Sequence, residues 1–330
     1  MRNFTFKGLL LTAVFMLLGC LSIQAANDDL ITKQITIKLD KAGTLPDRIA
    51  SSKKYKITNL KIVGEINGTD WNMIREMAGR NYQESSTEGN LSVLDLSEAK
   101  IVAGGDYYYY DNLFNNKVYT SNDEIGEYAF AYCSGLTSLT LPVGITSIGE
   151  FAFSGCSGLT SLTLPAGITS IGEYAFSRCS GLTSLTLPAG ITSIDKYAFS
   201  GCSRLTSLNL PAGITWIGES AFSYCSGLTS IYVYAEKVPR IGRYAFEGCA
   251  SRKCTLYVPK GTYDNYRLSE FGYFENIVEF DATGIDKTTT STDVEEVSRY
   301  SLNGQRLVGP TKGLNIVKYS DGSVKKVAVE

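Results

Sequence analysis

The middle of the chain repeats one seven-residue phrase at a fixed spacing. The phrase LTSLTLP begins at residues 136, 159 and 182, and it returns as LTSLNLP at residue 205. The pair Ala-Phe and a single Cys recur with the same period of 23 residues. A unit this short cannot bury its own apolar side chains, so neighbouring units must stack against one another. The period therefore predicts an elongated, stacked structure for this region.

One unit, residues 159–181, indicates how each copy folds. Leu162 and Leu164 alternate with Ser161 and Thr163, which predicts a short strand with its leucines inward and its polar side chains outward. Copies of this strand would stack about 4.8 Å apart in a parallel sheet. These features predict a leucine-rich repeat solenoid of 23-residue coils, with a parallel β-sheet and short outer turns or helices.

The repeat is specific enough to show a family resemblance. Residues 148–170 read IGEFAFSGCSGLTSLTLPAGITS, which closely resembles the BspA-like leucine-rich repeat family of secreted and cell-surface bacterial proteins. The resemblance covers at least residues 125–259. It implies a solenoid fold and non-enzymatic recognition, because members of this family include adhesins for extracellular host proteins.

The amino terminus has the features of an export signal. Two basic residues precede an apolar run over residues 8–18, and two alanines follow it. This order predicts a signal peptide over residues 1–25, and hence a secreted or cell-surface protein. A second interpretation stays open, because Leu-Leu-Gly-Cys at 17–20 resembles a lipobox, in which Cys20 would carry a lipid anchor. No later segment offers the roughly 20 consecutive apolar residues that a membrane span needs.

The rest of the chain divides around the repeats. The predicted units are an amino-terminal cap with divergent repeats at 26–124, regular repeats at 125–259, a carboxy-terminal cap at 260–282, a linker at 283–298 and a small β module at 299–330. Within the first cap, residues 57–63 read as a strand and residues 70–78 as a helix. The last module resembles the β modules of surface proteins from Gram-negative anaerobes, some of which are type IX sorting signals. A β appendage without a sorting role is the alternative.

Composition excludes several kinds of chemistry. The 330 residues contain no histidine, which excludes Ser-His-Asp triads, His-assisted cysteine nucleophiles and His-containing zinc sites. The Gly-rich phrases match neither a P-loop nor a dinucleotide fingerprint. We therefore expect no enzymatic activity, no cofactor and no metal. The formal net charge of −2 shows no basic excess, so nucleic acid is not an expected partner.

Seven of the eight cysteines lie beyond the predicted signal peptide. Five of them occupy the same position in successive coils. This regularity predicts a buried ladder of reduced thiols that act as small hydrophobic side chains. Cys249 and Cys254 are a pair outside the strict rhythm, and they are a candidate disulfide.

Candidate ligand-binding residues fall into three groups. The first is the row of outward-facing side chains on the predicted strands: Ser161, Thr163, Ser184, Thr186, Ser207 and Asn209. The second comprises aromatic residues that break the repeat, with Trp216 at a Ser position, Tyr232 at a Thr position and Tyr234 at a Pro position. The third is Tyr107, Tyr108, Tyr109 and Tyr110, in a segment that flanking Gly-Gly and Asp-Asn pairs predict to be a loop.

Each group also has a simpler interpretation. Ser and Thr suit exposed strands without any ligand, the irregular aromatics could pack against the carboxy-terminal cap, and the four tyrosines could fold over the amino-terminal cap. A buried aromatic anchor can contribute about 2 kcal/mol or more to binding, whereas a neutral hydrogen bond contributes about 0.5–1.5 kcal/mol. We therefore expect Trp216 and Tyr232 to dominate binding, and Ser184 to contribute little.

Three functional hypotheses are compatible with these features. The leading one is an exported, non-enzymatic recognition or adhesion protein that binds an extracellular protein or other macromolecule through its solenoid surface. The second is a glycan-capture protein that uses the exposed aromatic residues. The third is a structural spacer that projects another part of the cell surface.

Overall fold

The structure is a computed structural model that describes residues 30–112, 115–249, 252–282, 296–301, 306–307, 312–319 and 324–329. The predicted signal peptide at 1–25, the candidate lipid-anchor residue Cys20 and most of the predicted linker lie outside the described residues.

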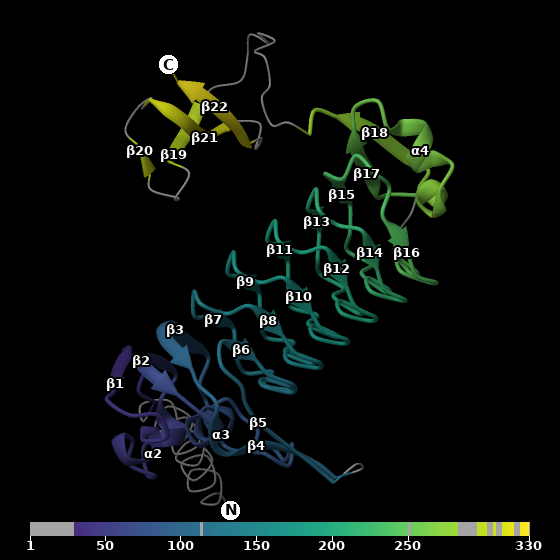
Figure 1. Ribbon diagram of the computed structural model, residues 1–330. Coiled ribbons are helices and arrows are strands. Elements are labelled where there is room, and N and C mark those ends of the chain that lie inside the picture. The colour runs from purple at the N-terminus through teal and green to yellow at the C-terminus, as the bar shows by residue number, and fades with distance from the viewer. Residues whose placement is uncertain are drawn as a thin grey trace, which may run out of the picture.

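A parallel sheet of ten strands runs along the molecule (Figure 1). In spatial order its strands are β1 (Ile35–Leu39), β2 (Asn59–Ile66), β3 (Val93–Ile101), β7 (Ser138–Thr140), β9 (Ser161–Thr163), β11 (Ser184–Thr186), β13 (Ser207–Leu210), β15 (Ser230–Val233), β17 (Thr255–Pro259) and β18 (Asn276–Phe280). Equal positions of neighbouring coils pair in register, so Leu185 lies between Leu162 and Leu208. All three leucines are buried. The predicted leucine-rich repeat solenoid is confirmed.

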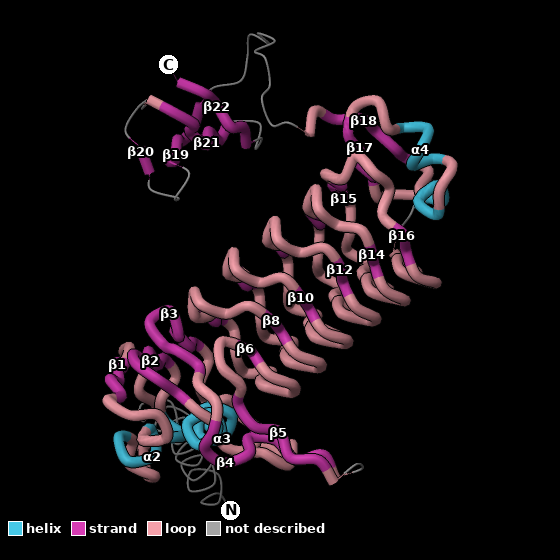
Figure 2. Tube along the Cα trace, in the orientation of Figure 1, coloured by secondary structure: helices cyan, strands magenta, loops and turns pink. Residues whose placement is uncertain are grey.

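Each regular coil also carries a second, two-residue strand that the sequence analysis did not predict (Figure 2). These strands are β6 (Glu124–Ile125), β8 (Ser147–Ile148) and β10 (Ser170–Ile171) in one parallel sheet, and β12 (Ser193–Ile194), β14 (Trp216–Ile217) and β16 (Arg240–Ile241) in another. Two residues are too few to show the alternation that marks a strand in a sequence. In the regular coils the isoleucine is buried, which leaves the preceding position at the surface.

Aromatic rings stack along the inside of the solenoid. The phenylalanine stack consists of the buried rings of Phe130, Phe153, Phe176, Phe199, Phe222 and Phe246, one from each Ala-Phe pair. Neighbouring ring centroids lie 4.9–5.4 Å apart, and their planes differ by at most 14°. This spacing is close to the separation of paired strands, so one Phe per coil builds a continuous stack.

A ladder of cysteine thiols lies beside the phenylalanine stack. The Cys156 thiol donates a hydrogen bond to the carbonyl oxygen of Phe130 at 3.0 Å, one coil earlier. The same contact recurs at Cys179, Cys202, Cys225 and Cys249, with lengths of 3.1–3.3 Å. Burial raises the pKa of the Cys179 thiol well above its ordinary value. The thiols of the ladder therefore link one coil to the next through hydrogen bonds.

The candidate disulfide between Cys249 and Cys254 is wrong. Both residues are free and buried. Cys249 lies 24 residues after Cys225, one more than the regular period. It still continues the ladder by donating its thiol proton to the carbonyl oxygen of Phe222 at 3.2 Å.

The amino-terminal cap covers the first ring of the stack. Helix α3 (Gly68–Met77) carries Trp71, whose ring centroid lies 5.2 Å from that of Phe130 at an angle of 52°. The Trp71 indole N–H donates to the carbonyl oxygen of Ala129 at 2.9 Å. The buried Arg75 guanidinium donates to the same oxygen at 3.1 Å. Residues predicted as a strand and a helix in this cap are confirmed as β2 and α3.

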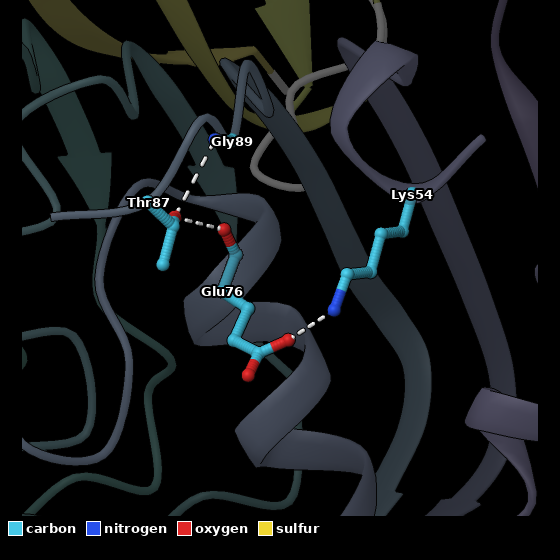
Figure 3. Close-up of polar contacts among 4 residues, drawn as sticks. All are labelled: Lys54, Glu76, Thr87 and Gly89. Atoms are coloured by element: carbon cyan, nitrogen blue, oxygen red, sulfur yellow. Dashed lines mark hydrogen bonds and ion pairs between the residues drawn. The ribbon is translucent and has the colours of Figure 1, made fainter. Parts of the chain in front are cut away.

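Short helices and polar contacts fix α3 against the rest of this cap (Figure 3). Helix α2 (Leu45–Arg48) and the 3₁₀ helix η1 (Lys54–Lys56) precede β2. The Lys54 ammonium contacts a carboxylate oxygen of Glu76 at 2.5 Å. The Thr87 hydroxyl donates to the Glu76 carbonyl oxygen at 2.6 Å, which ties the end of α3 to the segment that leads into β3.

The carboxy-terminal cap covers the last ring of the stack. Helix α4 (Tyr263–Arg267) and the 3₁₀ helix η2 (Glu270–Tyr273) lie between β17 and β18. The rings of Phe271 and Phe274 lie 6.0 and 5.7 Å from that of Phe246, at angles of 50° and 73°. Their tilt ends the parallel stacking and closes the core.

The residues after this cap contain a four-stranded antiparallel sheet. Its strands are β19 (Glu296–Ser301), β20 (Arg306–Leu307), β21 (Gly313–Tyr319) and β22 (Val324–Val329), in the order β20-β19-β21-β22. Strand β19 begins at Glu296, within the predicted linker at 283–298. Side-chain pairing helps to place this strand, since the buried Arg299 donates to Asn315 at 3.2 Å.

The cysteine ladder makes a prediction about thiol reactivity. Seven described cysteines are buried and free, and only the thiolate reacts quickly with disulfide reagents. We expect all seven to react slowly with Ellman's reagent in the native protein and quickly in denaturant without reductant. A fast native reaction, or fewer than seven thiols after denaturation, would contradict the buried ladder.

Candidate functional site

The main sheet carries the predicted row of polar side chains on its outward face. Ser161, Thr163, Ser184 and Thr186 are exposed, and Ser207 and Asn209 are half-buried. Within the described part of the chain, none of these six side chains makes a hydrogen bond. By contrast, the neighbouring Thr183 hydroxyl donates to the carbonyl oxygen of Thr160 at 3.2 Å. The fold thus explains the first threonine of the repeated phrase and leaves the outward row available to a partner.

Aromatic residues replace this polar row at the carboxy-terminal end of the main sheet. Tyr232 pairs with Asn209 on one side and Tyr257 on the other. Its ring stacks on that of Tyr257 at 4.3 Å, and Phe280 lies edge-on to both Tyr232 and Tyr234 at 5.7 and 5.2 Å. We call Tyr232, Tyr234, Tyr257 and Phe280 the aromatic end. All four side chains are half-buried, so part of each ring meets solvent.

Burial also affects the ionisation of the tyrosines at the aromatic end. It raises the pKa of both Tyr232 and Tyr234 above the ordinary tyrosine value. Both phenols are therefore neutral at physiological pH. The aromatic end offers apolar ring faces with neutral hydroxyl groups, and it continues the uncharged character of the polar row.

The predicted tyrosine loop is wrong, because residues 107–110 lie in a β-hairpin. Strand β4 (Gly104–Asp111) pairs antiparallel with β5 (Asn116–Thr120). Tyr108 and Tyr109 are buried against the amino-terminal cap, while Tyr107 and Tyr110 are half-buried. Consecutive tyrosines have a high strand propensity, and the Tyr108 hydroxyl donates to the carbonyl oxygen of Glu127 at 2.7 Å. Tyr108 and Tyr109 therefore pack into the cap, while part of Tyr107 and Tyr110 meets solvent.

Tyr109 also begins a second row of stacked rings. Its ring lies 4.0 Å from Tyr128, and the row continues through Phe151, Tyr174 and Tyr197 at spacings of 4.6–5.0 Å. The last four rings are half-buried. The sequence analysis missed this row, although an aromatic residue precedes Ala-Phe in four successive coils. That recurrence was the available signal.

A row of glutamates accompanies these rings. Glu127, Glu150 and Glu173 directly precede Tyr128, Phe151 and Tyr174. Burial, followed by the like charges of Glu173, Glu127 and Asp195, raises the pKa of the Glu150 carboxyl. Regular stacking therefore places equal charges near one another, which opposes folding when they are ionised.

Trp216 lies in the second row of strands, apart from the aromatic end. Its side chain is 38% exposed. In register it pairs with Ser193 on one side and Arg240 on the other. A cavity of about 620 Å³ opens beside it, lined in part by Lys237 and Arg240. The structure therefore brings Tyr232 and Tyr234 together, but it places Trp216 in a different sheet.

No group of three or more His, Cys, Asp or Glu side chains is arranged to hold a metal ion in the described part of the chain. None of the described helices has the length and apolar character needed to cross a membrane.

A capped solenoid with an outward face of polar and aromatic residues defines a leucine-rich repeat protein. Residues 123–253 match the family model described as BspA type leucine rich repeat region, in six copies. This match confirms the resemblance noted from the sequence for the repeat region. This family consists generally of binding scaffolds.

Several solved structures of bacterial proteins are similar to the chain. A leucine-rich repeat protein of T. pallidum is 28% identical over 46% of this chain and 80% of that chain, with a TM-score of 0.40. A leucine-rich cell surface protein from Faecalibacterium prausnitzii is 25% identical over 68% of this chain and 51% of that chain, with a TM-score of 0.39. A leucine-rich repeat protein from Bacteroides ovatus is 20% identical over 75% of this chain and 70% of that chain, with a TM-score of 0.34. No curated protein matches the chain.

The raised pKa of Glu150 makes a prediction about pH. A carboxyl whose pKa is higher in the folded state stabilises the fold when protonated, and this contribution is lost as pH rises through the folded-state value. Ionised Glu150 therefore destabilises the solenoid at neutral pH. We expect Glu150→Gln to raise the melting temperature at about pH 7 and to change it little at about pH 3.

Thermal unfolding followed by circular dichroism at both pH values measures this effect. Glu236→Gln is the matched control, because Glu236 is an exposed glutamate outside the row. A Glu150→Gln protein that melts at or below the wild-type temperature near neutral pH would show that the glutamate row is not repulsive.

Proposed function

We propose that this protein is an exported, non-enzymatic recognition protein that binds an extracellular protein at the aromatic end of its main sheet. The observation that carries the proposal is the change from polar side chains to Tyr232, Tyr234, Tyr257 and Phe280 on one outward surface. The predicted signal peptide supports export, and the BspA-type repeats support a binding role.

The solenoid does not need these four rings to close its core. Phe271 and Phe274 already cover the phenylalanine stack from inside the cap. The buried Tyr266 hydroxyl donates to the carbonyl oxygen of Ala235 at 2.6 Å, which fastens α4 to the last coils. Tyr232 and Tyr257 of the aromatic end lie on outward positions, where the preceding coils carry Thr186 and Asn209.

The chemistry of the aromatic end favours a protein partner. Tyrosine supplies a large contact area at a low cost in conformational entropy, and it is enriched among the residues that contribute most to protein interfaces. The rings are already held by stacking, so binding would order few side chains. The neighbouring Ser and Asn side chains can form a polar rim around the apolar centre.

The proposal predicts loss of binding when a stacked ring is truncated. The mature protein would be passed over immobilised extracellular-matrix proteins, with binding followed by surface plasmon resonance. We expect Tyr257→Ala and Tyr232→Ala to weaken binding at least tenfold, because each removes ring area at the centre of the surface. Ser184→Ala is the control, since Ser184 is exposed on the same face several coils away.

Stability must be measured in parallel, because the two tyrosines stack on each other. We expect each alanine variant to lose about 0.5–1.5 kcal/mol of unfolding free energy, the usual value of an aromatic pair. Binding would therefore be compared well below the melting temperature. Wild-type affinity in both tyrosine variants would place the site elsewhere, and no binding to any matrix protein would favour the spacer hypothesis.

A further inference from the structure

A break in the repeat creates a cavity on the second row of strands. The spacing of equivalent residues is 23 in the regular coils, but Ala221 and Ala245 are 24 residues apart. The additional residue falls in the segment that leads to β16. This segment contributes Lys237, Val238 and Arg240 to the wall of the cavity of about 620 Å³. Cavities of this size accommodate small organic ligands.

The opposite wall of the cavity belongs to the preceding coil. It includes the small residues Ala212 and Gly213 together with Trp216. In the coil before, the position of Trp216 is occupied by Ser193. The cavity therefore combines one flat aromatic surface with an open approach from solvent.

Both charged residues that line the cavity are cationic. Lys237 and Arg240 are both exposed, and neither forms an ion pair within the described part of the chain. No acidic residue lines the cavity there. Arg240 lies directly beside Trp216 in the strand register. Two cations without partners, in a chain of net charge −2, mark this place as a local anion-binding surface.

The position of the cavity also limits the kind of ligand. The backbone N–H of Arg240 donates to the carbonyl oxygen of Thr215 at 3.0 Å. The backbone of the two walls is therefore paired across the cavity, so an extended peptide could not add as a strand between β14 and β16. The Trp216 indole N–H has no hydrogen-bond partner among the described residues, so it remains a donor for a ligand hydroxyl.

We infer that the cavity beside Trp216 binds an anionic saccharide, meaning a sugar ring that carries a carboxylate or a sulfate group. The apolar face of the sugar would lie against the indole ring, because tryptophan presents a flat apolar body with a polar edge. The anionic group would face Arg240, whose planar guanidinium matches the geometry of two acceptor oxygens. Lys237 would supply a second positive charge. This site lies in a different sheet from the aromatic end and does not depend on it.

Tryptophan fluorescence offers a direct test. The chain has two tryptophans, and Trp71 is buried in the amino-terminal cap while Trp216 is exposed. Ligand at the cavity should therefore change the emission of Trp216 alone. The probes would be a galacturonic acid trisaccharide for carboxylate, a heparin tetrasaccharide for sulfate, and maltotriose as the neutral control. A short poly-glutamate peptide would test for binding by charge alone.

We expect saturable binding of at least one anionic saccharide, with affinity falling as salt is added. By isothermal titration calorimetry, Trp216→Ala and Arg240→Gln should each weaken binding at least tenfold. Arg204→Gln should not, because Arg204 is an exposed cation that does not line the cavity.

Four results would overturn the inference: equal binding of maltotriose, equal binding of poly-glutamate, wild-type affinity in both cavity variants, or no binding of either anionic saccharide. The matrix-protein assay reads the aromatic end separately, so failure at one site leaves the other measurable.

Discussion

The stack of phenylalanine rings is the interaction on which the solenoid depends. Each coil contributes one buried ring, and Trp71 and Phe271 close the two ends from the caps. Truncation of such a ring typically costs about 3–5 kcal/mol, whereas an ordinary surface substitution costs about 0.5 kcal/mol or less. Stability is therefore concentrated inside the coils. Outward positions can change without disturbing the stack.

The chain departs from its repeat at outward positions while the core stays regular. Tyr232 replaces a polar residue on the main sheet, yet the neighbouring Ile231 remains buried in its leucine position. Trp216 replaces a serine in the second row of strands, and Ile217 beside it also remains buried. The extra residue before β16 lies in the segment that lines the cavity beside Trp216, yet Phe222 remains stacked on Phe246. Both candidate binding surfaces arise in this way.

Features governed by the 23-residue period could be predicted from the sequence. The inward leucines, the parallel pairing and the buried cysteines all follow from placing equal residues in register. Features that depend on contacts between unlike segments could not. The stacking of Tyr109 on Tyr128 joins a hairpin to the first coil, and the cavity joins the Trp216 strand to an irregular turn. The recurring aromatic residue and the 24-residue spacing mark these places in the sequence, but neither shows which distant segment each one contacts.

The central claim is that the buried phenylalanine stack maintains the fold, while the outward residues that break the repeat carry out recognition. The most direct measurement uses a double variant, Trp216→Ser and Tyr232→Thr, in which both aromatic residues are replaced by those found at the same positions of earlier coils. Its melting temperature is compared with its binding to the matrix proteins and to the anionic saccharides. The account predicts that both binding signals are lost while the variant still unfolds cooperatively within a few degrees of wild type. A loss of about 1 kcal/mol shifts the melting temperature of a domain this size by only roughly 2–4 °C. Loss of cooperative unfolding, or binding that persists in a folded protein, would contradict the account.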